Sequence, residues 1–123
     1  MASKKSNATV QAPKTIENPQ TAEEFAERGW SNYSRKSFEQ AEMDFRRSLD
    51  LNPDNPDAMY ALGLNLAAAG KSQEAISTFE DVIEYLNNRI TDETRVRYYM
   101  LIRLSRGHIN RIKTGEWRLD GHG

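Results

Sequence analysis

The feature that most constrains this chain is one sequence spacing that four pairs of similar residues share. Each pair matches a large apolar or a small side chain with its counterpart: Phe25 and Met59, Gly29 and Gly63, Ala41 and Ala75, Phe45 and Phe79. A fixed period of roughly 20 to 50 residues is typical of stacked copies of one supersecondary unit. The chain is therefore expected to contain two copies of one unit.

Capping signals divide each copy into two helices. Thr21 followed by Glu24 forms a capping box, which predicts a first helix that ends near Ser34. Ser37 with Gln40 repeats the pattern at the start of a second helix. That helix must end before the segment LNPDNP, because its two prolines cannot continue a helix.

The same signals predict three more helices. Pro56 suits the first turn of a third helix, and Gly70 suits its C-terminal cap. Ser72 is expected to cap a fourth helix that reaches about Asn87, and Thr91 to begin a fifth that reaches about residue 113. No segment shows the alternation of a β-strand, so the predicted fold class is all-α with five helices.

Composition and domain limits agree with one modest soluble domain. The 123 residues are 37% hydrophobic and 28% charged, and no cysteine is present for disulfides or thiolate metal sites. The polar residues 1–20 are predicted to be a disordered tail, residues 21–113 the domain, and residues 114–123 a flexible tail. Within the domain we expect a first repeat at 22–55, a second at 56–89 and a capping helix at 91–113.

The register of the repeat resembles the tetratricopeptide repeat, a helix-turn-helix unit of an α-solenoid. The motif positions of the two units are Phe25, Gly29, Ala41, Phe45 and Pro53, and then Met59, Leu62, Gly63, Ala75 and Phe79. The resemblance covers residues 22–89. It implies that the glycine of one helix faces the alanine of its partner, so that Gly63 is expected to pack against Ala75.

Three positions depart from the family pattern. Arg28 stands where the first unit should have leucine, and Asn32 where an aromatic residue is usual. Asn87 replaces the proline that should close the second unit, so the fourth helix is expected to run on for an extra turn.

The fifth helix is predicted to cover the open apolar end of the second hairpin. Its residues Tyr98–Ile102 are apolar at five consecutive positions, which span the whole circumference of a helix. A covering helix with one wet face needs less apolar surface than this. Either the helix also lines a groove, or a second copy of the protein packs on it as a homo-oligomer.

The resemblance implies that the first helix of each hairpin lines a concave groove that binds a protein or peptide. The positions carried over give an aromatic groove made of Trp30, Tyr33, Tyr60, Leu64, Tyr98 and Ile102. Tyr and Trp are common anchors in protein interfaces. The predicted function is a protein-binding adaptor or assembly factor that needs no cofactor.

The carboxylate clamp found in one subgroup of the family is not expected here. Its lysine and asparagine positions hold Ala26, Trp30, Ala61 and Thr91, and only Arg95 fits. The groove is therefore predicted to prefer apolar side chains over a charged terminus.

Catalysis and a metal site have little support, because the only histidines are His108 and His122 and no ligand cluster is evident. Nucleic-acid binding is the alternative from another class. Residues 17–88 carry 14 acidic and 6 basic side chains (net −8), whereas residues 89–123 carry 8 basic and 4 acidic (net +4), with Tyr98, Tyr99 and Trp117 among the arginines.

Location and the chain terminus complete the sequence predictions. The first residues have no apolar segment behind their lysines, and no apolar run approaches the length of about 20 residues that a membrane span needs. A cytoplasmic location is the expectation. Trp117, in the polar segment TGEWRLDGHG, is either a second contact element or packs back on the fifth helix.

Overall fold

A computed structural model describes residues 16–116, and the predictions for the outer parts of both tails lie outside these residues. The described part contains five α-helices: α2 (Ala22–Ser34), α3 (Phe38–Leu51), α4 (Pro56–Ala68), α5 (Ser72–Asn87) and α6 (Arg95–Thr114). No strand occurs among residues 16–116. The predicted all-α class with five helices is confirmed.

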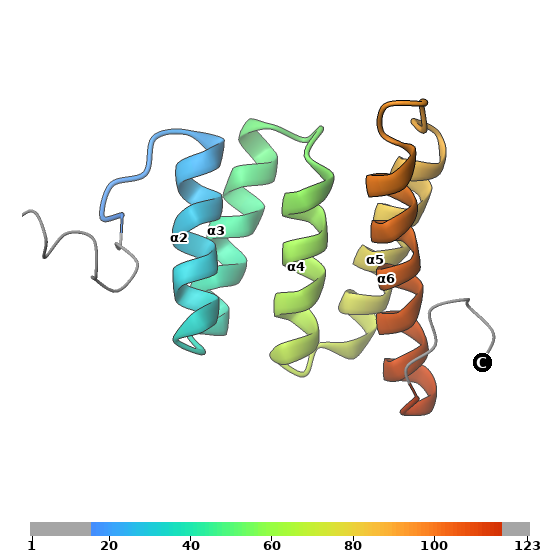
Figure 1. Cartoon of the computed structure of the whole chain (residues 1–123). Coiled ribbons are helices and arrows are strands. Elements are labelled where there is room, and N and C mark those ends of the chain that lie inside the picture. The colour runs from blue at the N-terminus through green and yellow to red at the C-terminus, as the bar shows by residue number, and fades with distance from the viewer. Residues whose placement is uncertain (1–15, 117–123) are drawn as a thin grey trace, which may run out of the picture.

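The helices form two layers (Figure 1). Helices α2, α4 and α6 make up one layer, and α3 and α5 lie behind the spaces between them. Helix α3 packs on both α2 and α4, and α5 packs on both α4 and α6, whereas the backbones within the first layer come close at few positions. This zigzag is the arrangement expected of two stacked hairpins followed by one more helix.

The ends of α2 and α4 follow from capping chemistry. The Thr21 hydroxyl accepts a hydrogen bond from the backbone N–H of Glu24 at 3.1 Å, as predicted, while the Glu24 carboxylate accepts one from the N–H of Gln20. At α4, the side-chain oxygen of Asn55 accepts from the N–H groups of Asp57 and Ala58, and Pro56 occupies the first turn. Each cap satisfies donors that the helix itself leaves unpaired.

Two predicted helix starts and one predicted capping hydrogen bond are corrected. Ser37 precedes α3, but its side chain makes no capping hydrogen bond, and the residue before α5 is Lys71 rather than Ser72. Thr91 lies in a turn closed by hydrogen bonds with Thr94, so α6 begins at Arg95. The residue type at these positions permits a cap, but the local backbone does not bring the side chain to the first N–H groups of the helix.

The core runs continuously along the stack. One cluster joins α3, α4, α5 and α6, and its fully buried members include Phe45, Leu66 and Phe79. A second cluster consists of Val82 and Leu86 of α5 with Ile102 of α6. Helix α6 therefore covers the apolar side of the second hairpin, which is the role predicted for it.

Each hairpin depends on a glycine that faces an aromatic ring. A Cβ atom built on Gly63 would lie 2.7 Å from Cε1 of Phe79, and one on Gly29 would lie 2.7 Å from Cε1 of Phe45. The three atoms nearest to a Cβ on Gly63 all belong to Phe79, so this ring is the side chain for which the glycine makes room, and the expected packing against Ala75 stays a prediction. The glycine leaves room for the ring, and Ala75 is buried in the same cluster.

The turns inside the two hairpins share one conformation. Lys36 (φ 63°) and Gly70 (φ 83°) occupy equivalent positions of the two repeats, and both have a left-handed backbone. This region suits glycine, whereas a Cβ atom adds strain.

Replacing Lys36 with Gly should raise the free energy of unfolding by about 0.5 to 1 kcal/mol, measured by urea denaturation. Lys36→Ala keeps the strain and should bring no such gain; equal gains for both variants would contradict this account.

The missing proline at residue 87 has a small effect. Helix α5 ends at Asn87, whereas α3 ends at Leu51, whose counterpart in the second repeat is Tyr85. The fourth helix thus continues past its counterpart only through Leu86 to Asn87, which is less than the expected extra turn.

Candidate protein-binding surface

The four groove residues predicted on α2 and α4 lie on the layer that these helices share. Tyr33, Tyr60 and Leu64 are half-buried and pack against the main core cluster, and Trp30 is 41% exposed. We call these four residues the aromatic face. Contacts with the core fix the positions of Tyr33, Tyr60 and Leu64. Trp30 is the most exposed ring of the aromatic face.

Trp30 is fixed by its neighbours although it reaches solvent. Its ring meets Tyr33 edge-on with centroids 5.6 Å apart and meets Phe45 in the same manner at 5.4 Å. Tyr33 in turn contacts Phe38 of the next helix at 6.0 Å. An exposed indole whose rotamer is already set loses little conformational entropy when it is covered by a partner.

Tyr60 is committed to contacts with α6. Its hydroxyl shares a hydrogen bond of 2.9 Å with Nε2 of His108, and the His108 ring stacks on Phe79 with centroids 4.8 Å apart. Burial raises the pKa of the Tyr60 phenol, and Tyr33 adds a smaller effect in the same direction. His108 thus joins α6 to both helices of the second hairpin.

Burial lowers the pKa of His108, and Arg111 lowers it further by charge repulsion. The unfolded chain therefore binds this proton more tightly than the folded protein. The stabilisation that the neutral, buried His108 ring contributes is complete above its pKa of about 6.5 in the unfolded chain. It is lost as the pH falls through the lower pKa of His108 in the folded protein. We expect the urea concentration at the unfolding midpoint to be lower at pH 5.5 than at pH 7.5. His108→Gln should show a smaller fall over this interval, and an identical fall in both proteins would contradict the assignment.

The two groove residues predicted on α6 have different surroundings. Tyr98 is half-buried beside the second core cluster, whereas Ile102 is only 2% exposed and packs in that cluster with Val82 and Leu86. A third unit with the same spacing would begin at residue 90, since α2 begins at 22 and α4 at 56, but α6 begins at Arg95. This delay turns the helix by about 140° beyond one full turn, which moves Ile102 from a lining position into the core.

Many basic side chains near α6 already have local partners. Arg95 pairs with Asp92, Arg97 pairs with Asp57 of α4, and Arg89 lies 3.8 Å above the ring of Tyr85. An arginine bound to a carboxylate attracts phosphate less strongly, so the nucleic-acid alternative gains no support here. The carboxylate clamp also finds none, because Ala61 is fully buried and Arg95 is paired.

Among residues 16–116, no group of three or more His, Cys, Asp and Glu side chains could hold a metal ion. None of the helices in this part of the chain is long and apolar enough to cross a membrane.

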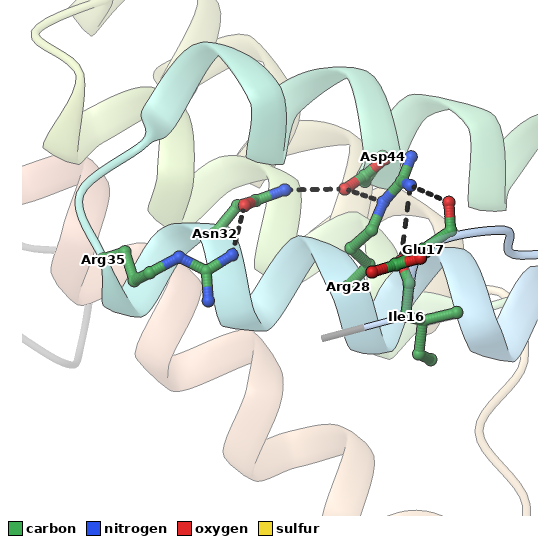
Figure 2. Close-up of polar contacts among 6 residues, drawn as sticks. All are labelled: Ile16, Glu17, Arg28, Asn32, Arg35 and Asp44. Carbon is green, nitrogen blue, oxygen red and sulfur yellow. Dashed lines mark hydrogen bonds and ion pairs between the residues drawn. The ribbon is translucent and has the colours of Figure 1, made fainter. Parts of the chain in front are cut away.

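A polar cluster between α2 and α3 was not predicted from the sequence (Figure 2). The Arg28 guanidinium donates to both carboxylate oxygens of Asp44, at 3.0 and 2.8 Å, and to the backbone oxygens of Ile16 and Glu17. Asn32 donates to Asp44 at 2.9 Å and accepts from Arg35. Hydrogen bonding to Asp44 raises the already high pKa of Arg28.

This cluster explains both departures in the first repeat. Leu62 and Leu66, the counterparts of Arg28 and Asn32 in the second repeat, are 5% and 0% exposed in the core. No described helix precedes α2 to pack against these two positions, and here the half-buried Arg28 and the buried Asn32 hydrogen-bond to Asp44 instead. The mismatch with the repeat pattern at positions 28 and 32 was the sequence signal that could have revealed the cluster.

Comparisons with known proteins agree with this architecture. A family model described as Tetratricopeptide repeat matches residues 33–96, which is more than half of the chain. Searches of curated proteins and of solved structures returned no match. The matched residues include α3, α4 and α5 in full, and the contacts above explain their regular spacing of small and aromatic positions. The chain belongs to the tetratricopeptide repeat family.

Proposed function

We propose that this protein is a non-catalytic adaptor or assembly factor that binds a segment of another protein on the aromatic face. Membership in the repeat family supports a role in protein–protein interaction generally. The observation that favours this face is Trp30, an indole that is 41% exposed and yet held by Tyr33 and Phe45. Anchors of this kind carry much of the free energy in protein interfaces.

The chemistry of the face favours an apolar segment. Its half-buried members expose ring and aliphatic surface, and the Tyr60 hydroxyl is engaged by His108. No basic side chain belongs to the four residues of the face, so a charged terminus has no counter-ion there. A partner is expected to insert an apolar or aromatic side chain against Trp30 and Leu64, as the sequence also predicts.

Selection from a displayed library of random peptides tests this proposal. Peptides recovered on the wild-type protein should bind Trp30→Ala at least tenfold more weakly by fluorescence anisotropy, which corresponds to about 1.4 kcal/mol. Met43→Ala is the matched control, because Met43 is 70% exposed on α3 and lies outside the face. Its affinity should equal that of the wild type.

Two outcomes count against the proposal. The first is that every recovered peptide binds Trp30→Ala as tightly as it binds the wild type. The second is a preference for peptides with an acidic C-terminus over apolar ones, since the face offers such a terminus no cation.

A further inference from the structure

Helix α6 has a second apolar side that nothing in the described part of the chain covers. Val96, Tyr99 and Met100 are 77%, 50% and 56% exposed. With Leu104 and Arg103 they line one open depression of about 430 Å³. We call these five residues the outer face of α6. They lie apart from Ile102, Ser105 and Ile109, which are buried. An apolar patch of this kind on a soluble protein often marks an interaction site.

The fold indicates what shape fits this face. Helices α2 and α4 are each followed by a helix, α3 and α5, that packs beside them to complete a hairpin. Helix α6 continues their layer at the end of the stack, and no helix of residues 16–116 lies beyond it (Figure 1). A helix laid against the outer face would stand to α6 as α3 stands to α2.

Charge indicates the chemistry of that helix. Residues 89–116 carry 7 basic and 3 acidic side chains, and Arg89, Arg95 and Arg97 among them have the local partners given above. Arg103, within the outer face, is exposed and forms no ion pair or hydrogen bond with any residue of 16–116. The helix that α6 already accepts on its other side, α5, has four acidic and no basic side chains. The complement to the outer face is therefore an apolar stripe flanked by carboxylates.

Two other occupants fit less well. A symmetric pairing of two outer faces would bring two Arg103 side chains and two positively charged segments 89–116 together, and like charges oppose such pairing. Residues 117–123 contain two glycines, one arginine and one aspartate, so they lack an acidic amphipathic pattern. We propose that the outer face of α6 binds an acidic amphipathic helix of a partner protein, which completes a third hairpin.

A designed pair of peptides tests this proposal on the full chain. Each peptide is about 18 residues long, capped at both ends, with Leu and Phe along one helical stripe and either Glu or Lys beside it. The Glu peptide should bind with a dissociation constant of tens of micromolar and become helical by circular dichroism. The Lys peptide should bind at least tenfold more weakly, and raised salt should reduce this difference.

Substitutions locate the binding. The double substitution Val96→Ser with Met100→Ser should lower the affinity for the Glu peptide at least tenfold. Arg103→Glu should reduce the ratio of the affinities for the Glu and Lys peptides. Met43→Ser, a comparable loss of an exposed apolar side chain, should change neither value. Peptides that depend on Trp30 should still bind all three variants, so failure of this site and failure of the proposed function are separable.

Each of four results would overturn the proposal: absence of Glu-peptide binding at about 1 mM, equal affinity for both peptides, full affinity in the doubly substituted variant, or an unchanged preference in Arg103→Glu.

Two further measurements address the other occupants. If solution mass doubles with concentration and Met100→Ser abolishes the doubling, a second copy covers the face. If a variant ending at Glu116 binds the Glu peptide at least tenfold more tightly, the chain's own last residues cover it. Either result rejects the partner helix as the native occupant.

Discussion

Gly63→Val should lower the free energy of unfolding by about 3 kcal/mol, because a side chain at this position collides with a buried ring. The added Cβ would lie 2.7 to 3.0 Å from three carbons of Phe79, whose side chain is fully buried. The ring cannot move aside without disturbing Tyr60 and His108, which contact it at centroid distances of 5.8 and 4.8 Å. Urea denaturation followed by circular dichroism measures this loss.

The control for Gly63→Val is Ala68→Val, which places the same side chain on an exposed position of the same helix. Its cost should stay near the difference in helix propensity, about 0.5 kcal/mol. In a Phe79→Leu background, the smaller and more flexible neighbour should reduce the cost of Gly63→Val by at least about 1 kcal/mol. Equal costs in the two backgrounds would show that the ring is not the cause.

Asp44→Ala is expected to destabilise the protein by about 2 to 3 kcal/mol. Its side chain is 6% exposed and accepts hydrogen bonds from both Arg28 and Asn32, so its removal leaves two donors without their acceptor. Breaking a fully buried pair costs about 3 to 5 kcal/mol. We expect less here, because the Arg28 side chain is 28% exposed and can regain some hydration.

An exposed ion pair provides the comparison for Asp44→Ala. Asp57 pairs with Arg97, and their side chains are 61% and 55% exposed, so Asp57→Ala should cost no more than about 1 kcal/mol. Both variants remove a carboxylate from a helix that contacts another helix through an arginine. Thermal or urea unfolding that gives equal losses for the two would contradict the role assigned to the buried cluster.

The repeat made most of the fold predictable from the sequence. Glycines at 29 and 63 face phenylalanines at 45 and 79, and buried alanines at 41 and 75 precede the phenylalanines on the same helices. This close approach of the two helices of a hairpin leaves a periodic trace in the sequence. Gly70 likewise marked the end of α4 correctly. The left-handed turn at Lys36 carried no such mark, because the chain tolerates the strain of a lysine there.

The site was less predictable because it depends on the register of α6. The linker between α5 and α6 delays the helix from the predicted Thr91 to Arg95, and the sequence has no proline or capping box that fixes its start. Ile102 therefore lies in the core instead of the predicted groove, and Val96, Tyr99 and Met100 form the exposed side. Similarly, an arginine at position 28 signalled a departure from the repeat without naming Asp44 as its partner.

Amide hydrogen exchange along α6 tests most directly the claim that this helix closes the repeat stack while keeping an open outer face. Ile102, Ser105 and Ile109 pack against the second hairpin, so the amides of Arg95–Thr114 beyond the first turn should exchange as slowly as those of α4. Exchange of α6 at the rate of an unstructured peptide, with α4 and α5 still protected, would contradict the account.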